Sequence, residues 1–412
     1  MDGFRVLDLT TTFMGPYATM LMARMGADVV KIEGPGGDVV RHIGSSRSPG
    51  MGPIYLTANH GKRSVALDLK VPQARDALLR LVETADVFVT NLRPAALRGL
   101  QVTADELCAI NPRLVYCTLP GFGAGGPYRD RPAYDDVIQA ASGLAATQGG
   151  TGEPQYIRNV IADKTTALMG VSAVLAALLS RSRTGRGQCV EVPMFETMVS
   201  YSLVEQLNAR TFLPPRASTG YARTSSPSRR PYRTADGHLG VMIYTDRQWL
   251  SFFGIIGSPH LAHEERFSSI TRRTENIDEL YELVADVLPT RTTADWLAAF
   301  EPVGIAAQRV VSPDELFDDP HLAAVDMFEE FQHHSEGAIV LPRLPINFAG
   351  QHTAPVRGAP LWGEHGAELL RETGLDAAAI AQLHESGALL GADPAEPQSE
   401  APAVAGQPPA IP

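Results

Sequence analysis

The residue best suited to covalent chemistry is Asp163, a single carboxylate at the start of the apolar segment TTALMGVSAVLAALL (165–179). A Thr-Gly-Arg-Gly-Gln turn closes this segment, which predicts a helix that ends there and leads into a strand. From the residues alone, Asp163 is either a helix N-cap or a carboxylate nucleophile. The two roles are compatible, because the N-terminus of a helix favours the ionised carboxylate that nucleophilic attack requires.

Basic residues of the N-terminal segment lie mostly at loop ends, where they form either a solvated face or a pocket for a polyphosphate ligand. They are Lys31, Arg41, Lys62, Arg63, Lys70, Arg93 and Arg98. Any such pocket would be local, because the chain holds 35 Lys and Arg against 46 Asp and Glu, a formal charge of −11. Since that balance repels phosphate backbones, we expect no nucleic-acid partner.

The segment GFGAGG (121–126) has the glycine spacing of a dinucleotide-binding loop and follows a predicted strand. Pro127 and the residues YRDRP come next, in place of the helix that such a loop opens. The Gly-Lys-Ser/Thr of a P-loop is also missing after these glycines. We therefore expect neither a nicotinamide site nor a P-loop at this position.

The three cysteines, Cys108, Cys117 and Cys189, have neither CxxC nor metal-ligand spacing. We therefore expect a reduced, cytoplasmic protein without a metal site. The N-terminal residues MDGFRVLDLTTTF lack the basic and apolar regions of a signal peptide. The longest apolar run is shorter than the roughly 18 residues that span a membrane, so we expect a buried helix there and no membrane partner.

Strands and helices alternate along the N-terminal half, which predicts a parallel, doubly wound α/β sheet. The expected strands are FRVLDLT (4–10), DVVKIE (28–33), SVALDL (64–69), DVFVTN (86–91), RLVYCTLPG (113–121) and QCVEVPM (188–194). Ligands of such sheets bind at the carboxyl ends of the strands, so the loops that follow these strands are where binding residues are expected.

The composition changes after residue 221, where a loop rich in Pro, Ser and Gly begins. We divide the chain into a large α/β domain (1–221), a smaller α/β domain (222–312) and a return to the large domain (313–390). The last residues, 391–412, are rich in Pro and Ala without an apolar period, which is typical of a disordered tail.

Several motifs together resemble the class III CoA-transferases, the family of formyl-CoA, crotonobetainyl-CoA and succinyl-CoA-dependent transferases that also contains α-methylacyl-CoA racemase. They run in the family's order from residue 4 to about 366. They are RVLDLTTTFMGPYATMLMARMGADVVKIEGPGGDVVR, KRSVALDLK, ADVFVTNLRPAAL, INPRLVYCTLPGFGAGGPYRDRPAYDDVIQAASG, Asp163 with LAALLSRSRTGRGQCVEV, and LWGEH. The resemblance implies a CoA-binding large domain and two chains interlinked as rings in a homodimer.

The resemblance also implies a mechanism, in which Asp163 attacks the donor thioester and forms first a mixed anhydride and then an aspartyl-CoA thioester. Coenzyme A and acyl-CoA would be substrates, with a small carboxylic acid as the other partner and no permanently bound cofactor. The implied CoA-binding residues are Phe13, Arg41, Lys70, Asn91, Leu92, Arg93, Arg98 and Tyr134. Phe13 replaces a family glutamine, and Arg41 takes over the phosphate contact of a family arginine that is Gly34 here.

Two questions of specificity follow from the resemblance. A racemase needs a base on each face of the α-carbon, and family racemases place His-Asp where this chain has Tyr134-Asp135. Tyrosine, with a pKa near 10, is a poor base at neutral pH, so we expect transfer and keep racemisation as the alternative. The glycine-rich flap of the oxalate-linked enzymes is absent, and Arg229, Arg230 and Arg233 in that region either bind a dicarboxylate or lie in a solvated loop.

Overall fold

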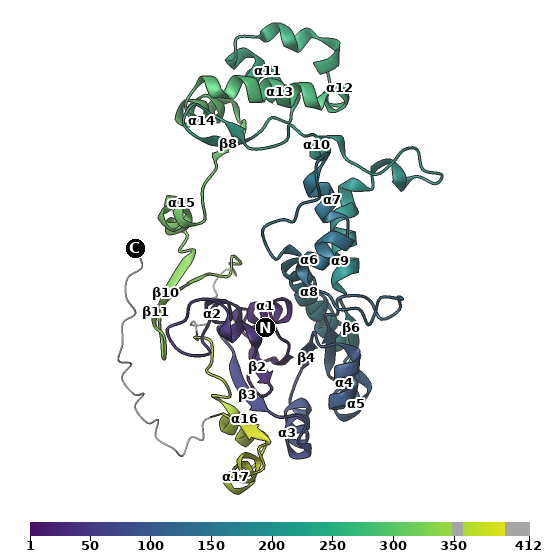
Figure 1. The fold of residues 1–412 in the computed structure, drawn as a ribbon, viewed down its shortest axis with the longest axis vertical. Helices are drawn as coiled ribbons and strands as arrows, with labels where there is room; N and C mark the ends of the chain where they lie inside the picture. The colour runs from purple at the N-terminus through teal and green to yellow at the C-terminus, as the bar shows by residue number, and fades with distance from the viewer. Residues whose placement is uncertain (348–356, 392–412) are drawn as a thin grey trace.

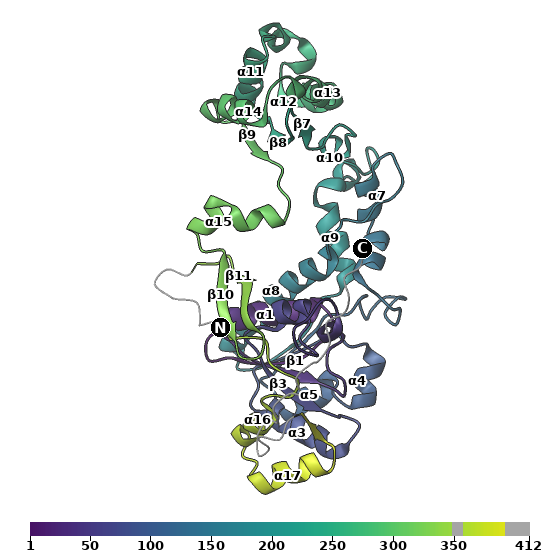
Figure 2. The same cartoon turned by 60° about the vertical axis from the view of Figure 1, so that its left-hand side comes forward.

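The computed structural model describes residues 1–347 and 357–391. Figure 1 shows two lobes, a large one that holds both ends of the described chain and a small one joined to it by two separate connections. The turned view in Figure 2 shows the same separation of the lobes. The predicted disordered tail, apart from Gly391, lies outside the described residues.

A seven-stranded sheet forms the centre of the large lobe, in the order β12-β3-β2-β1-β4-β5-β6. Six strands are parallel and β12 pairs antiparallel with β3, so the predicted, mostly parallel α/β sheet is confirmed. The strands are β1 Arg5–Leu9, β2 Asp28–Glu33, β3 Arg63–Leu67, β4 Val87–Thr90, β5 Val115–Thr118, β6 Cys189–Glu191 and β12 Leu389–Leu390.

Helices cover both faces of this sheet because successive side chains of each strand point to opposite sides. In β1, Val6 packs into the core with helices α1, α8 and α9, whereas Leu7 packs into a second core with α3, α16 and α17. These helices are α1 Met14–Arg24, α8 Ile161–Thr184, α9 Met194–Gln206, α3 Pro72–Glu83, α16 Gly366–Glu372 and α17 Ala377–Glu385. The remaining helices of the lobe are α2 Pro53–Asn59, α4 Pro94–Leu100, α5 Ala104–Ile110, α6 Asp135–Ala141 and α7 Leu144–Gly149.

The long helix α8 is less buried than its sequence predicts. By length and composition it could cross a membrane, yet one of its faces packs in the core of the lobe. Gly170 allows that packing, because a Cβ there would lie 2.9 Å from a methyl carbon of Leu119. The opposite face leaves Leu168, Leu175 and Leu179 exposed, so the expectation of a buried helix holds for one face only.

The small lobe has its own core, built around Trp249, Phe252 and Trp296. A three-stranded antiparallel sheet of β7 Tyr232–Arg233, β8 His238–Met242 and β9 Ala306–Arg309 lies beside its helices. Those helices are α10 Ala222–Ser225, α11 Asp246–Ile255, α12 Ile270–Glu275, α13 Ile277–Val287 and α14 Thr293–Phe300. The chain then returns through α15 Pro320–Ala324 and the hairpin of β10 Phe328–His333 and β11 Gly337–Pro342.

Candidate active site

A cavity of about 310 Å³ lies where the strand order of the large sheet reverses, between the loops that follow β1 and β4. Ligand sites of doubly wound sheets are found at such switch points, because the loops on either side turn away from each other. The cavity brings together six of the residues named from the sequence, which are Phe13, Asn91, Leu92, Arg93, Tyr134 and Asp163.

The loop after β1 is held in a strained conformation by two polar side chains. Thr12 has a φ of +75°, which is unfavourable for a β-branched residue. The Asp38 carboxylate accepts hydrogen bonds from the Thr11 hydroxyl and the Thr12 N–H, both at 3.0 Å. Asn91 donates to the Thr11 carbonyl at 2.9 Å and accepts from the Thr11 N–H at 3.0 Å. The carboxamide of Asn91 therefore shapes the cavity wall by clamping the β1 loop.

Asp163 is the third residue of α8 and is partly buried at the cavity. The N-cap position is Val160, whose own side chain makes no capping hydrogen bond, so the interpretation of Asp163 as an N-cap is wrong. Instead, the backbone N–H of Asp163 donates to the carboxylate of Asp135 at 3.0 Å. Gln139 holds that carboxylate from the other side with an amide hydrogen bond of 2.6 Å. A residue of α6 thus satisfies the N-terminus of α8.

The surroundings of Asp163 favour its neutral form. Burial, together with the negative charge of Asp135, raises the pKa of the Asp163 carboxyl to about 7. The expectation that the helix N-terminus keeps this carboxylate ionised is therefore corrected, because desolvation outweighs the helix dipole here. At neutral pH the group is close to its midpoint, where it can lose a proton readily and act as a nucleophile.

The glycine loop 121–126 is held by acidic side chains. The N–H of Gly123 donates to Glu196 at 3.0 Å, and the N–H of Ala124 donates to Glu191 at 3.1 Å. A Cβ at Gly121 would overlap the side chain of Ala133. Gly121 and Gly123 therefore serve close packing against Ala133 and Glu196. Carboxylates of the chain accept the N–H groups of Gly123 and Ala124, which are therefore not available to a phosphate.

The continuation of this loop supplies Arg129 and Arg131 to the Asp163 cavity. Sequence reasoning missed both residues, although it identified their loop as one that follows a strand of the sheet. The signal that was available is their position, since two arginines immediately precede the Tyr134 segment on the ligand edge of a parallel sheet.

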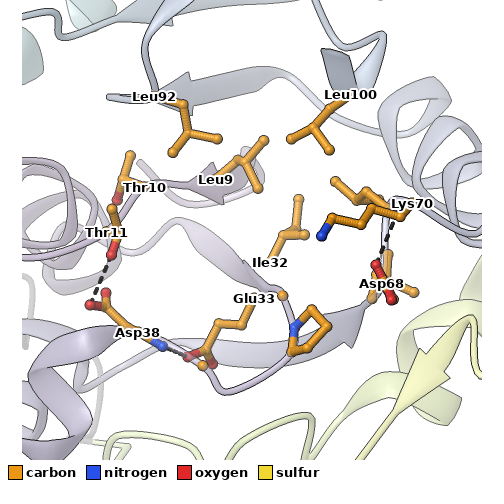
Figure 3. Close-up of a pocket in the computed structure, with 15 residues that line it drawn as sticks. Leu9, Thr10, Thr11, Ile32, Glu33, Asp38, Asp68, Lys70, Leu92 and Leu100 are labelled. Carbon is orange, nitrogen blue, oxygen red and sulfur yellow. Dashed lines mark hydrogen bonds between the residues drawn. The ribbon is translucent and has the colours of Figure 1, made fainter. Parts of the chain in front are cut away.

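Lys70 lines a second cavity of about 220 Å³, shown in Figure 3. Its walls are mainly apolar and include Leu9, Ile32, Leu92 and Leu100. The two cavities adjoin, because Thr11 and Leu92 line both of them. Arg98 lines a third cavity of about 630 Å³, which Leu92 also lines.

Arg41 is not brought to these cavities. Its guanidinium is buried, binds both carboxylate oxygens of Glu33 at 2.8 and 2.6 Å and stacks on the ring of Tyr55. The side chain thus neutralises a buried acid, and the phosphate contact expected from it has no support in this geometry. Arg229, Arg230 and Arg233 are exposed residues of the small lobe that do not line the Asp163 cavity.

Comparison with known proteins identifies the family. The model of CoA-transferase family III matches residues 1–366. The succinyl-CoA:mesaconate CoA-transferase of Haloarcula hispanica is 34% identical over 393 residues, which cover 91% of this chain and 96% of that protein. Rv3272 of Mycobacterium tuberculosis, named a probable fatty acyl-CoA transferase, is 32% identical over 387 residues, which cover 90% and 97%. A crystal structure of Rv3272 matches with a TM-score of 0.77 at 32% identity and covers 90% of this chain and 98% of that one. The chain therefore belongs to CoA-transferase family III and is an enzyme of that family, as its motifs predicted.

Proposed function

We propose that this enzyme moves CoA from an acyl-CoA thioester to a carboxylic acid with Asp163 as the nucleophile. The observation that carries the proposal is the placement of one partly buried carboxyl at the switch-point cavity, beside cationic side chains and next to the Lys70 cavity. Relatives whose names describe CoA transfer to mesaconate or glutarate support the reaction class.

The first half-reaction loads CoA onto the enzyme. An oxygen of ionised Asp163 attacks the thioester carbon, the C–S bond breaks, and CoA thiolate leaves a mixed anhydride behind. The thiolate then attacks the aspartyl carbonyl carbon, and the anhydride C–O bond on that side breaks. The donor acid departs as a carboxylate, and Asp163 carries CoA as a thioester.

The second half-reaction reverses these steps with the acceptor acid. Its carboxylate attacks the aspartyl thioester, releasing thiolate and forming a second mixed anhydride. The thiolate then attacks the acceptor's acyl carbon, which gives the new acyl-CoA and regenerates the Asp163 carboxylate. The hydrogen bonds of Asp135 and Gln139 hold the start of α8 in place through both halves.

We place the adenosine end of CoA in the Lys70 cavity and its thioester end at Asp163. The apolar walls of the Lys70 cavity suit an adenine ring, and the two cavities meet at Thr11 and Leu92. Lys70 and Arg93 are exposed cations without an ion pair in the described part of the chain, so both are available to phosphate groups.

We further propose that two chains form the interlinked dimer that the family resemblance implies. The exposed apolar residues Leu175 and Leu179 on α8 and Tyr201 and Val204 on α9 support this assembly. Large apolar side chains that are exposed together on neighbouring helices are typical of protein interfaces. The two connections between the lobes leave each chain the outline of a ring, as Figure 1 shows.

Racemisation is less well supported at this site, because it needs a second base beside Asp163. The Asp135 carboxylate already accepts hydrogen bonds from Asp163 and Gln139, and Tyr134 is 70% exposed. A transferase leaves the α-hydrogen of the acyl group in place, whereas a racemase exchanges it with deuterium oxide.

Trapping the acylated enzyme tests the proposal. After incubation with succinyl-CoA and hydroxylamine, mass spectrometry of the wild type should find a hydroxamate at Asp163. Asp163→Asn should show no label and no CoA exchange while its circular dichroism spectrum stays that of the wild type. Label confined to another residue would refute Asp163 as the nucleophile.

A further inference from the structure

Arg131 is anchored to the core of the large lobe through a row of aromatic rings. Its guanidinium carbon lies 3.8 Å from the ring centroid of Tyr128. Tyr128 packs edge-on against Phe122 at 5.7 Å, and Phe122 contacts Phe195 of α9 at 5.5 Å. Stacking of this kind restricts a long side chain before any ligand arrives, which lowers the entropy lost on binding.

The backbone around Arg131 is fixed as well. Its N–H donates to the Tyr128 carbonyl at 2.9 Å. Earlier in the same loop, Glu191 and Glu196 accept the N–H groups of Ala124 and Gly123. The guanidinium is therefore presented to the Asp163 cavity from a loop whose first residues are held by acidic side chains and whose later residues form a hydrogen-bonded turn.

The charge of Arg131 is not neutralised within the described residues 1–347 and 357–391. No carboxylate forms an ion pair with it there, whereas the neighbouring Arg129 lies 3.3 Å from Asp130. Asp163 is the only acidic residue among the described residues that line the cavity, and it makes no hydrogen bond with Arg131. Arg131 is thus free to bind an anionic group that is brought in by a ligand.

We propose that Arg131 binds the free carboxylate of a dicarboxylic acid whose other carboxyl group exchanges CoA at Asp163. This inference rests on the proposed transferase function and adds the substrate class. The free carboxylate keeps its charge through both half-reactions, so one arginine can hold the acid as a thioester, as an anhydride and as a released product. An acid with an alkyl chain at that end would offer the guanidinium no partner.

The competing role for Arg131 is contact with the phosphates of CoA. Lys70 and Arg93 already lie along the path from the Lys70 cavity to Asp163, on the loops that follow β3 and β4. Arg131 comes from the loop after β5, on the far side of β4 in the sheet. That arrangement leaves Arg131 for the acid.

The test compares two acyl-CoA donors of equal chain length, succinyl-CoA and butyryl-CoA, in single-turnover acylation of Asp163. We expect the wild type to prefer succinyl-CoA. Arg131→Gln should slow acylation by succinyl-CoA about tenfold or more, as loss of a charge-assisted bond implies, and leave butyryl-CoA within about twofold. Arg131→Lys keeps the positive charge but lacks the two parallel N–H donors of the guanidinium. It should recover part of the succinyl-CoA rate.

Arg183→Gln, an equal loss of charge at the exposed far end of α8, is the matched control and should alter neither rate. If Arg131→Gln slowed acylation equally with both donors, Arg131 would be assigned to binding CoA and the inference would be overturned. Unchanged acylation rates with both donors would overturn it as well. Wild-type protein that is acylated by neither thioester would instead contradict the proposed function, and the inference with it.

Discussion

At the scale of single residues, the most informative property of the site is the raised pKa of Asp163. A carboxyl with a pKa of about 7 in the folded protein is destabilised when ionised, relative to the same group in water. The fold thus holds the proposed nucleophile in surroundings that disfavour its charge, and the proposed acylation would remove that charge. In the proposed mechanism, the neutral anhydride and thioester of Asp163 would relieve the cost of desolvating a charged carboxylate.

This pKa gives a prediction about stability. Between the unfolded pKa of 3.8 and about 7, the folded protein retains a proton that the unfolded chain releases, so Asp163 makes the protein less stable as pH rises. Asp163→Asn has no such penalty. Its stability relative to the wild type should therefore increase from pH 5 to pH 8 by about 1–3 kcal/mol, measured by urea unfolding. A constant difference between the two proteins across this range would contradict the raised pKa.

The residues of the site differ in how far the sequence could reveal them. Asp163, Tyr134 and the Asn91–Arg93 loop could be predicted because their motifs are local runs of residues in a fixed order, and they line one cavity. Arg41 was predicted to contact phosphate but does not line the Asp163 cavity, and its pairing with Glu33 and Tyr55 is a tertiary contact that no local pattern records. Arg131 was not predicted for the same reason, because the role proposed for it depends on the side chains that surround it.

At the scale of elements, the six parallel strands were predictable because each is a short apolar run in a βαβ sequence. The exposed face of α8 was not predictable, since an apolar helical segment has the same sequence pattern whether all of its surface or only one face is buried. The hydrogen bond that satisfies the N-terminus of α8 could not be predicted either, because its acceptor, Asp135, belongs to another helix, α6.

The turn after α8 explains why its motif carries two glycines. Gly185 has a φ of +73°, the left-handed conformation that ends many helices. Gly187 has a different reason, because a Cβ there would overlap the carbonyl of Leu114. This close approach of the turn to the residue before β5 puts β6 beside β5.

Substitution at these glycines separates the two reasons. Gly187→Ala should destabilise the protein by about 3 kcal/mol or more, because the methyl group collides with backbone that cannot rotate away. Gly185→Asn, the matched variant, should cost less than about 1 kcal/mol, since asparagine tolerates the left-handed region. Urea unfolding measures both. Equal stability of Gly187→Ala and the wild type would refute the close approach.

At the scale of the whole molecule, the exposed apolar faces of α8 and α9 predict a dimer. Wild-type protein should sediment at twice the 44.3 kDa mass of the chain. A double variant, Leu179→Glu with Val204→Glu, should sediment as a monomer, because charged groups would be desolvated at the contact. Leu250→Glu, at an exposed leucine of the small lobe, should leave the dimer intact. A monomeric wild type would rule out the interlinked assembly.

The pairing of β12 with β3 joins residues that are more than 300 positions apart, Leu389 with Leu67. Ion pairs repeat the connection, since Arg63 binds Glu368 at 2.9 Å and Glu372 at 2.6 Å. During synthesis on the ribosome, the β3 edge must therefore stay open while the whole small lobe emerges. The sheet of the nascent chain is complete only when Leu389 and Leu390 have been synthesised. Until then the unpaired edge of β3 is exposed to chaperones and to other chains.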